Sequence, residues 1–102
     1  MQSPVRYERG RIHVDGEMTV YTCSDLKARL FAELADHMDA TELDLSGVVE
    51  IDTAGLQLLL IARRYVSDGG RELRVSNPSR PVSDVLELCR LNACLTAEAS
   101  AQ

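Results

Sequence analysis

Aromatic residues, lysine and long apolar runs are all scarce in this sequence. Aromatic side chains make up 4% of the 102 residues, Trp is absent, and Phe31 is the one phenylalanine. Proteins that bind single-stranded nucleic acids stack the bases on aromatic rings, so this composition disfavours that class. The longest strictly apolar run, Leu58–Ala62, is far too short to cross a bilayer. We therefore expect no direct insertion into a membrane.

Basic charge is scarce as well. The chain has 11 Lys and Arg residues against 16 Asp and Glu residues, a formal net charge of −5, and Lys27 is its one lysine. Residues 1–51 hold ten acidic and five basic side chains, whereas residues 52–102 hold six of each, so neither half is basic. Nucleic-acid-binding domains usually carry a basic patch. We therefore expect no nucleic-acid partner.

Cysteine is too sparse and too irregularly spaced for a disulfide framework or a metal site. There are three cysteines and no C-x-x-C pair: Cys23, Cys89 and Cys94. The two histidines, His13 and His37, lie far from them and show no metal-ligand spacing. We interpret the cysteines as buried free thiols in a reducing compartment and expect no metal and no cofactor. The first residues form no apolar signal core, which also favours a cytoplasmic location.

The length and the aliphatic content predict one domain. A chain of 102 residues with 45% hydrophobic side chains can form a single core without disulfides. We expect one domain over residues 1–102, with its core at about residues 5–95. The hydrophobic pattern predicts five strands: Val5–Glu8, Arg11–Asp15, Thr41–Leu45, Arg71–Ser76 and Ala93–Thr96. Gly16-Glu17 is expected to end the second strand.

Three helices are expected between these strands. The first follows Thr22–Asp25, which resembles a capping box, and the third begins near Pro81. The second covers Leu56–Ser67 and is stopped by Gly69-Gly70. Its polar stripe is so narrow that we expect a sheet and a neighbouring helix to cover most of it. Because single helices separate the later strands, those strands should pair in parallel. We predict an α/β fold, a mixed β-sheet of four to five strands covered by three to four α-helices.

The start of the second helix departs from local rules. Asp52 suits the N-cap position, which makes Thr53 the first helical residue, with its hydroxyl outward at the positive end of the helix dipole. A glycine such as Gly55 costs a helix about 1 kcal/mol relative to alanine. Ala54 and Gly55 also leave room for another molecule to approach. However, Asp and Thr are ordinary capping residues, and Gly55 is equally consistent with close helix–strand packing alone.

The longer segment around this helix start resembles a known family. Residues 43–56 read LDLSGVVEIDTAGL. This is similar to the signature of STAS domains (sulfate transporter and anti-sigma factor antagonist), where Asp-Ser-Ser/Thr-Gly-Leu follows an apolar strand and opens an apolar helix. Gly16-Glu17 and Gly69-Gly70 match further landmarks in order. The resemblance covers about residues 5–95 and implies a STAS-like fold.

The resemblance also implies a function. Small bacterial STAS proteins are anti-sigma factor antagonists, which bind an anti-sigma factor that is also a Ser/Thr kinase and so free the sigma factor. The kinase phosphorylates the first hydroxyl residue after the motif Asp, which ends the binding; a PP2C-type phosphatase is a further partner. The matching phosphorylation candidate is Thr53. The expected partner-binding surface consists of Asp52, Thr53, Ala54, Gly55 and Gln57.

The same resemblance leaves a second function open. Some STAS subunits attach to membrane-transport ATPases, including phospholipid-type ABC transporters, and others accompany chemotaxis-type signalling proteins; in these, Thr53 would dock without phosphorylation. The chain departs from the usual antagonist pattern, with Thr53 in place of the commoner Ser. Ala54 stands where a second hydroxyl often occurs, and Thr19 stands where many antagonists have Asp. The spacing of nucleophiles, bases and metal ligands indicates no active site, so we expect no enzyme.

Overall fold

The chain begins with a β-hairpin. In the computed structural model, which describes residues 3–91 and Leu95, β1 (Val5–Glu8) pairs antiparallel with β2 (Arg11–Met18). The turn is Arg9-Gly10, and both residues have positive φ, 51° and 80°. This combination matches the twist of a two-residue hairpin. The first two predicted strands are therefore confirmed, and they pair as a hairpin.

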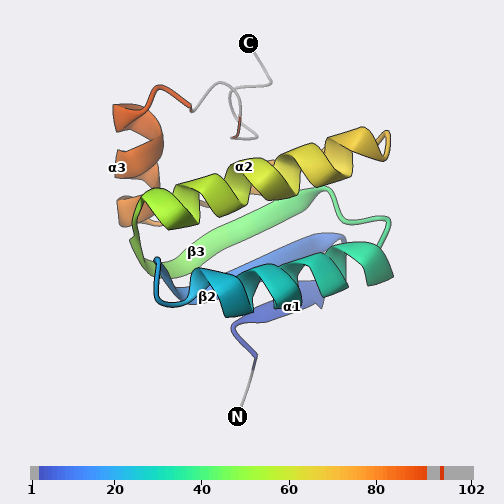
Figure 1. The fold of residues 1–102 in the computed structure, drawn as a ribbon. Helices are drawn as coiled ribbons and strands as arrows, with labels where there is room; N and C mark the ends of the chain where they lie inside the picture. Colours follow the sequence, from blue (N-terminus) through green and yellow to red (C-terminus); the bar gives the residue numbers. More distant parts are fainter. Residues whose placement is uncertain (1–2, 92–94, 96–102) are drawn as a thin grey trace.

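Four strands form one mixed sheet in the order β1-β2-β3-β4 (Figure 1). β3 (Glu42–Ile51) pairs in parallel with β2, and β4 (Arg74–Ser76) pairs in parallel with β3. Each parallel partner is reached through a helix, as the strand–helix alternation predicts. The predicted mixed α/β fold is confirmed.

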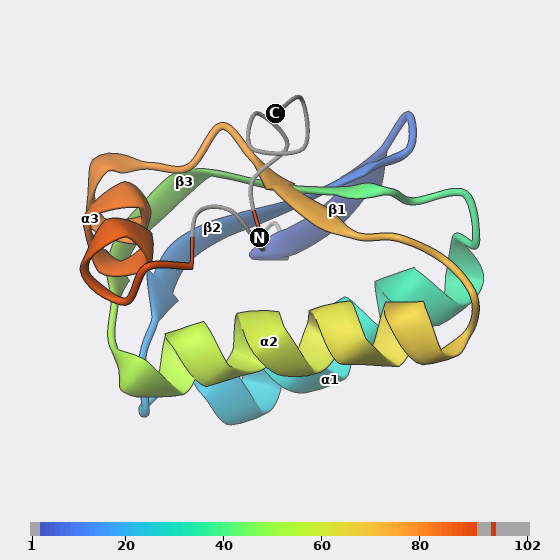
Figure 2. The same cartoon turned by 90° about the horizontal axis from the view of Figure 1, so that it is seen from above.

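Two helices cover one face of this sheet. α1 (Cys23–Asp36) and α2 (Thr53–Asp68) lie side by side beneath it in Figure 2. α3 (Arg80–Leu88) packs against β3, near the end of the sheet where α2 begins (Figures 1 and 2). The core between the layers is aliphatic, and its largest fully buried side chains include Ile12, Met18, Leu30, Leu34, Leu43, Leu45, Leu59 and Leu86.

β2 and β3 are both longer than predicted. β2 continues through Gly16-Glu17, and β3 continues past Leu45 to Ile51. Their pairing shifts register twice, and each time β3 contains one residue more than β2, as in a β-bulge. The bulges reverse the alternation along β3, so that Val48 is buried while Val49 is 67% exposed.

The later elements also differ from the prediction. β4 begins at Arg74, because the chain before it is still passing the end of α1, where the Arg71 side chain donates hydrogen bonds to the carbonyls of Leu34 and His37. Most of the strand predicted over Ala93–Thr96 lies outside the described residues. Its described member, Leu95, is helical and donates its N–H to the carbonyl of Leu91 at 3.1 Å.

α2 is less covered than its pattern predicts. It packs against the sheet and α1, as expected, but Leu60, Ile61 and Tyr65 remain 36%, 44% and 41% exposed. The reason is that only α1 lies beside it within the described residues, so its outer face stays open (Figure 2).

The cysteines are less buried than predicted. Cys89 is exposed and Cys23 is half-buried, and both are free thiols. Cys89 is exposed because it is the C-cap residue of α3, where the chain leaves the helix. Cys94 lies outside the described residues.

Candidate functional site

Asp52 joins the start of α2 to the loop between β2 and α1. It is the N-cap residue of α2, and its Oδ1 accepts a hydrogen bond from the Gly55 N–H at 3.1 Å. Its Oδ2 accepts from the N–H of Val20 at 2.9 Å, and its own N–H donates to the carbonyl of Met18 at 3.2 Å. The hydrogen bond from the Val20 N–H is the main cause that holds the pKa of the Asp52 carboxyl below its usual range. Desolvation raises this pKa, and the N–H groups of Gly55 and Ala54 lower it further. The predicted N-cap is confirmed, and it also positions a second segment.

Gly55 allows the first turn of α2 to lie directly against β2. A Cβ atom at this position would lie 2.2 Å from the carbonyl oxygen of Met18 and 2.8 Å from Cγ1 of Ile51. Gly55 is itself buried. Close helix–strand packing therefore explains this glycine, which supports the site from beneath instead of forming its surface.

The other predicted site residues lie on or near the surface. Thr53 is the exposed first residue of α2, Gln57 is exposed one turn later, and Ala54 is half-buried between them. Ala54 and Gln57 line a shallow hollow between α1 and α2, together with Cys23 of α1. The exposed Thr53 thus directly precedes Ala54, a residue of an open, mostly apolar hollow.

Two exposed apolar side chains lie in the loop that Asp52 ties to the start of α2. Val20 and Tyr21, in the loop from β2 to α1, are 66% and 92% exposed. The sequence interpretation did not include them in the site. Their signal in the sequence is two large apolar residues in a connection, directly before a helix start and outside any periodic pattern.

The loop that holds these side chains is built by its own hydrogen bonds. Oγ1 of Thr22 accepts from the N–H of Thr19 at 3.0 Å and donates to the carbonyl of Glu17 at 2.8 Å. Thr22 is the N-cap residue of α1, as predicted, but its side chain makes no capping hydrogen bond, because these two loop contacts use it instead. Thr19 is 4% exposed, and its Oγ1 accepts from the N–H of Tyr21 at 3.3 Å. The loop therefore presents Tyr21 in a defined position.

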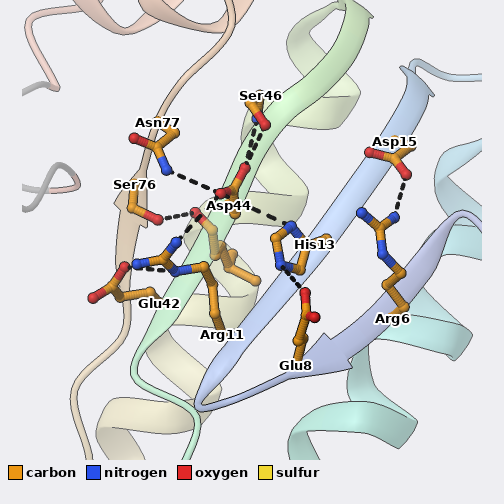
Figure 3. Close-up of polar contacts among 11 residues, drawn as sticks. Arg6, Glu8, Arg11, His13, Asp15, Glu42, Asp44, Ser46, Ser76 and Asn77 are labelled. Atoms are coloured by element: carbon orange, nitrogen blue, oxygen red, sulfur yellow. Dashed lines mark hydrogen bonds and ion pairs between the residues drawn. The ribbon is translucent and has the colours of Figure 1, made fainter.

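A separate polar cluster surrounds Asp44 on the face of the sheet away from α1 and α2 (Figure 3). Asp44 is 5% exposed and accepts from Oγ of Ser46 at 2.7 Å and from Nδ2 of Asn77 at 3.0 Å. Burial raises the pKa of the Asp44 carboxyl, but the hydrogen bonds from Asn77 and Ser46, with nearby His13, outweigh it and lower the pKa overall. His13 also lies 3.6 Å from Glu8. The cluster ties β3 to the residue that follows β4, a structural role.

Cys23, a free thiol of α1, does not form a nucleophile–base pair with His13. Burial, and then the charge of Asp52, raise the pKa of the Cys23 thiol, which makes it a weaker nucleophile at neutral pH. His13 lies on the face of the sheet away from α1, which separates its imidazole from the thiol of Cys23 in α1. Within residues 3–91, no three His, Cys, Asp or Glu side chains are grouped to hold a metal ion, and no helix is long and apolar enough to cross a bilayer.

Solved structures share this fold. TM1081 of Thermotoga maritima, described in its crystal structure as a candidate anti-sigma factor antagonist, aligns with a TM-score of 0.75 and 22% identity over 91% of this chain and 82% of that one. The anti-sigma factor antagonist SpoIIAA, in its unphosphorylated form, aligns with a TM-score of 0.67 and 17% identity over 95% of this chain and 90% of that one. At these identities the likeness establishes the fold alone.

Sequence comparison gives the family. No sequence among the curated proteins matches the chain. A family model described as "Mlab, STAS domain" matches residues 4–97. This match covers nearly the whole chain and confirms the resemblance that the Asp52–Gly55 segment carries. The chain therefore belongs to the STAS domain family.

Proposed function

We propose that this STAS protein is an anti-sigma factor antagonist that acts by partner switching in the cytoplasm. It binds an anti-sigma factor that is also a Ser/Thr kinase, and phosphorylation of Thr53 ends the binding. The observation that supports this function best is the exposed Thr53 at the start of α2, beside an apolar surface and the fixed loop that carries Tyr21. We propose no catalytic activity for the chain itself.

The position of Thr53 gives the switch a physical basis. A phosphate adds about −1.5 to −2 charges and three acceptor oxygens at neutral pH. The helix dipole favours this charge at the start of α2, whereas the neighbouring Asp52 carboxylate, already bound to the N–H groups of Val20 and Gly55, opposes it. These effects offset each other within the protein, so a large refolding is not expected. The phosphate instead acts on a docked partner through bulk, charge and desolvation.

The proposal is tested with the purified GHKL-type kinases of the source organism. Each is incubated with the protein and ATP, and phosphate is mapped by mass spectrometry. We expect modification at Thr53 by one kinase, which binds wild-type and Thr53→Ala protein alike. Thr53→Glu should weaken that complex by about tenfold or more, equal to about 1.4 kcal/mol. An active kinase that binds the protein but leaves Thr53 unmodified, with Thr53→Glu binding like wild type, would argue against the switch.

A second function has its own supporting observation. The motif Asp52-Thr53-Ala54-Gly55 has the Asp-Thr-small-Gly form that also occurs in STAS subunits of phospholipid-type ABC transporters. In that role, or in a chemotaxis-type complex, the same surface would dock without phosphorylation. Binding to purified transporter ATPase subunits is therefore measured alongside binding to the kinases. Stable binding to an ATPase subunit, with no kinase partner, would select this alternative. A PP2C-type phosphatase that removes phosphate from Thr53 would instead support partner switching.

A further inference from the structure

A groove runs between α1 and α2, away from the end that carries Thr53. Two hollows form it, and both include Ile61 in their lining. The nearer hollow also contains Ala54 and Lys27, and the farther one contains Phe31 and Tyr65. We call these two hollows, which meet at Ile61, the α1–α2 groove. The near end of the groove is lined by Ala54, the residue that follows Thr53.

The floor and wall of the groove are apolar and connected across the two helices. The rings of Phe31 (α1) and Tyr65 (α2) stack with their centroids 4.9 Å apart. Tyr65 and Ile61 remain 41% and 44% exposed. Two of the four aromatic residues of this aromatic-poor chain therefore lie together at one partly exposed site. A contiguous apolar surface of this kind is typical of a protein-interaction site.

The charges along the groove are mainly positive. Lys27 lies with its Nζ 5.8 Å from the centre of the Phe31 ring, and Arg64 lines the farther hollow. Within residues 3–91 neither makes an ion pair, whereas most other basic residues there are paired with carboxylates. Asp68 is the acidic residue of the groove, at its far end. On a chain of net charge −5, two cations that make no ion pair with a described residue, against one carboxylate at the far end of the groove, favour an occupant that is both apolar and acidic.

The length of the groove suits a helix. Its α2 side extends from Ala54 to Asp68, which at 1.5 Å per residue is about 21 Å, or roughly four turns of a helix. An amphipathic helix presents apolar side chains at i, i+3, i+4 and i+7 along one face, which is the usual mode of recognition in a groove between helices.

We propose that the α1–α2 groove binds an acidic amphipathic helix of the partner protein that docks at Thr53. This inference rests on the proposed function, which supplies the partner. It adds that the docking segment of that partner is an acidic amphipathic helix. Carboxylates on the helix face Lys27 and Arg64, and its apolar side chains contact Ile61 and the Phe31–Tyr65 pair. A phosphate on Thr53 adds negative charge at the near end of the groove, where it repels an acidic occupant. The same surface thereby binds the partner and responds to the modification.

The test compares matched variants in binding to the kinase that binds wild-type protein. Ile61→Asp removes an apolar contact and adds a charge that repels the helix; Leu88→Asp is its control, because Leu88 is 83% exposed on α3. Lys27→Glu combined with Arg64→Glu reverses the charge of the groove. Arg63→Glu combined with Arg80→Glu is the control for that change, since it alters the net charge equally and neither residue lines the groove. Circular dichroism and thermal unfolding confirm that each variant folds.

We expect Ile61→Asp and the double charge reversal each to weaken the complex by about tenfold or more, and each control to stay within about twofold. The double reversal should also reduce the salt dependence of binding, because the pairs it removes are screened by salt. If the kinase binds wild type and all variants alike, the groove proposal is overturned while the proposed function stands. If Ile61→Asp instead dissociates a dimer of this chain and leaves kinase binding unchanged, a second copy occupies the groove and the proposal fails. If no kinase binds the wild type, the proposed function is wrong, and the proposal that a helix of the kinase occupies the groove is wrong with it.

Discussion

At the scale of single residues, the site depends on a carboxylate and a missing side chain. Asp52 accepts from the N–H groups of Val20 and Gly55, so one carboxylate holds both the loop and the helix start. The capping rules predict the position of Asp52 from the sequence, because they depend only on neighbouring residues. For Gly55 the sequence left two interpretations open, close packing or an open surface, because the choice depends on the contact with Met18, which is distant in the sequence.

Replacing Gly55 tests the close contact beneath the site. We expect Gly55→Ala to destabilise the protein by about 1–3 kcal/mol, as overpacking of a filled site does, although alanine favours a helix by about 1 kcal/mol. The reason is that the new Cβ would lie 2.2 Å from the Met18 carbonyl oxygen. The measurement is urea unfolding at neutral pH.

Gly69→Ala is the matched control for this change. A Cβ at Gly69 would lie 3.5 Å from its nearest neighbour, the carbonyl oxygen of Val66, and the residue has a φ of −86°, which alanine adopts readily. Its unfolding free energy should stay the same or rise by about 0.4–1 kcal/mol. Equal stability of the two variants would show that α2 does not lie as close to β2 as described.

At the scale of secondary-structure elements, Asp52 ties the loop between β2 and α1 to the start of α2. Tyr21 is 92% exposed in a loop that several hydrogen bonds order. Ordered, exposed Tyr residues are frequent energetic centres of protein interfaces. The sequence interpretation ended β2 before Gly16 and therefore treated this loop as an approach to α1.

Removing the Tyr21 ring should separate binding from folding. We expect Tyr21→Ala to change the unfolding free energy by less than about 0.5 kcal/mol, as for most exposed positions. It should weaken kinase binding by about 30-fold, equal to about 2 kcal/mol. Isothermal titration calorimetry and urea unfolding measure the two effects. Leu88→Ala, at a similarly exposed position of α3, should change neither the unfolding free energy nor kinase binding. If Tyr21→Ala binds the kinase like wild type, the loop is not part of the interface.

The lengths of the elements were less predictable than their order. The order of strands and helices follows from hydrophobic periodicity, which is local information. The extra residues of β3 at its two register shifts depend on pairing with β2, and they bury Val48 where simple alternation would bury Val49. The exposed groove face of α2 was likewise missed, because an apolar pattern does not show whether another element covers it.

At the scale of the whole molecule, the two faces of the sheet have different chemistry. α1 and α2 cover one face (Figure 2), and the other face carries the polar cluster around Asp44 (Figure 3). The cluster is satisfied by contacts among β2, β3 and the residue after β4. The surface with unpaired cations and exposed apolar side chains is on the helical side, where Thr53 also lies.

The Asp44 cluster predicts a pH dependence of stability. Because folding lowers the pKa of Asp44, its charged form stabilises the folded protein above the ordinary pKa of an aspartate. That contribution is lost as the pH falls through the lower, folded pKa. Wild type should therefore exceed Asp44→Asn in unfolding free energy at neutral pH, and the difference should shrink below about pH 4.

The measurement is urea unfolding of both proteins between neutral pH and about pH 3. Asp36→Asn is the control, because Asp36 is exposed at the end of α1 and makes no ion pair with a described residue. A difference between wild type and Asp44→Asn that stayed constant with pH would contradict a charged, stabilising Asp44.

The most direct test of the central claim is the affinity of one protein preparation for its kinase partner before and after stoichiometric phosphorylation of Thr53. The account predicts a loss of about tenfold or more on phosphorylation, equal to about 1.4 kcal/mol, and full recovery after a PP2C-type phosphatase removes the phosphate. Near-ultraviolet circular dichroism should change little, because the switch acts on docking. Equal affinity of the two forms would contradict the account.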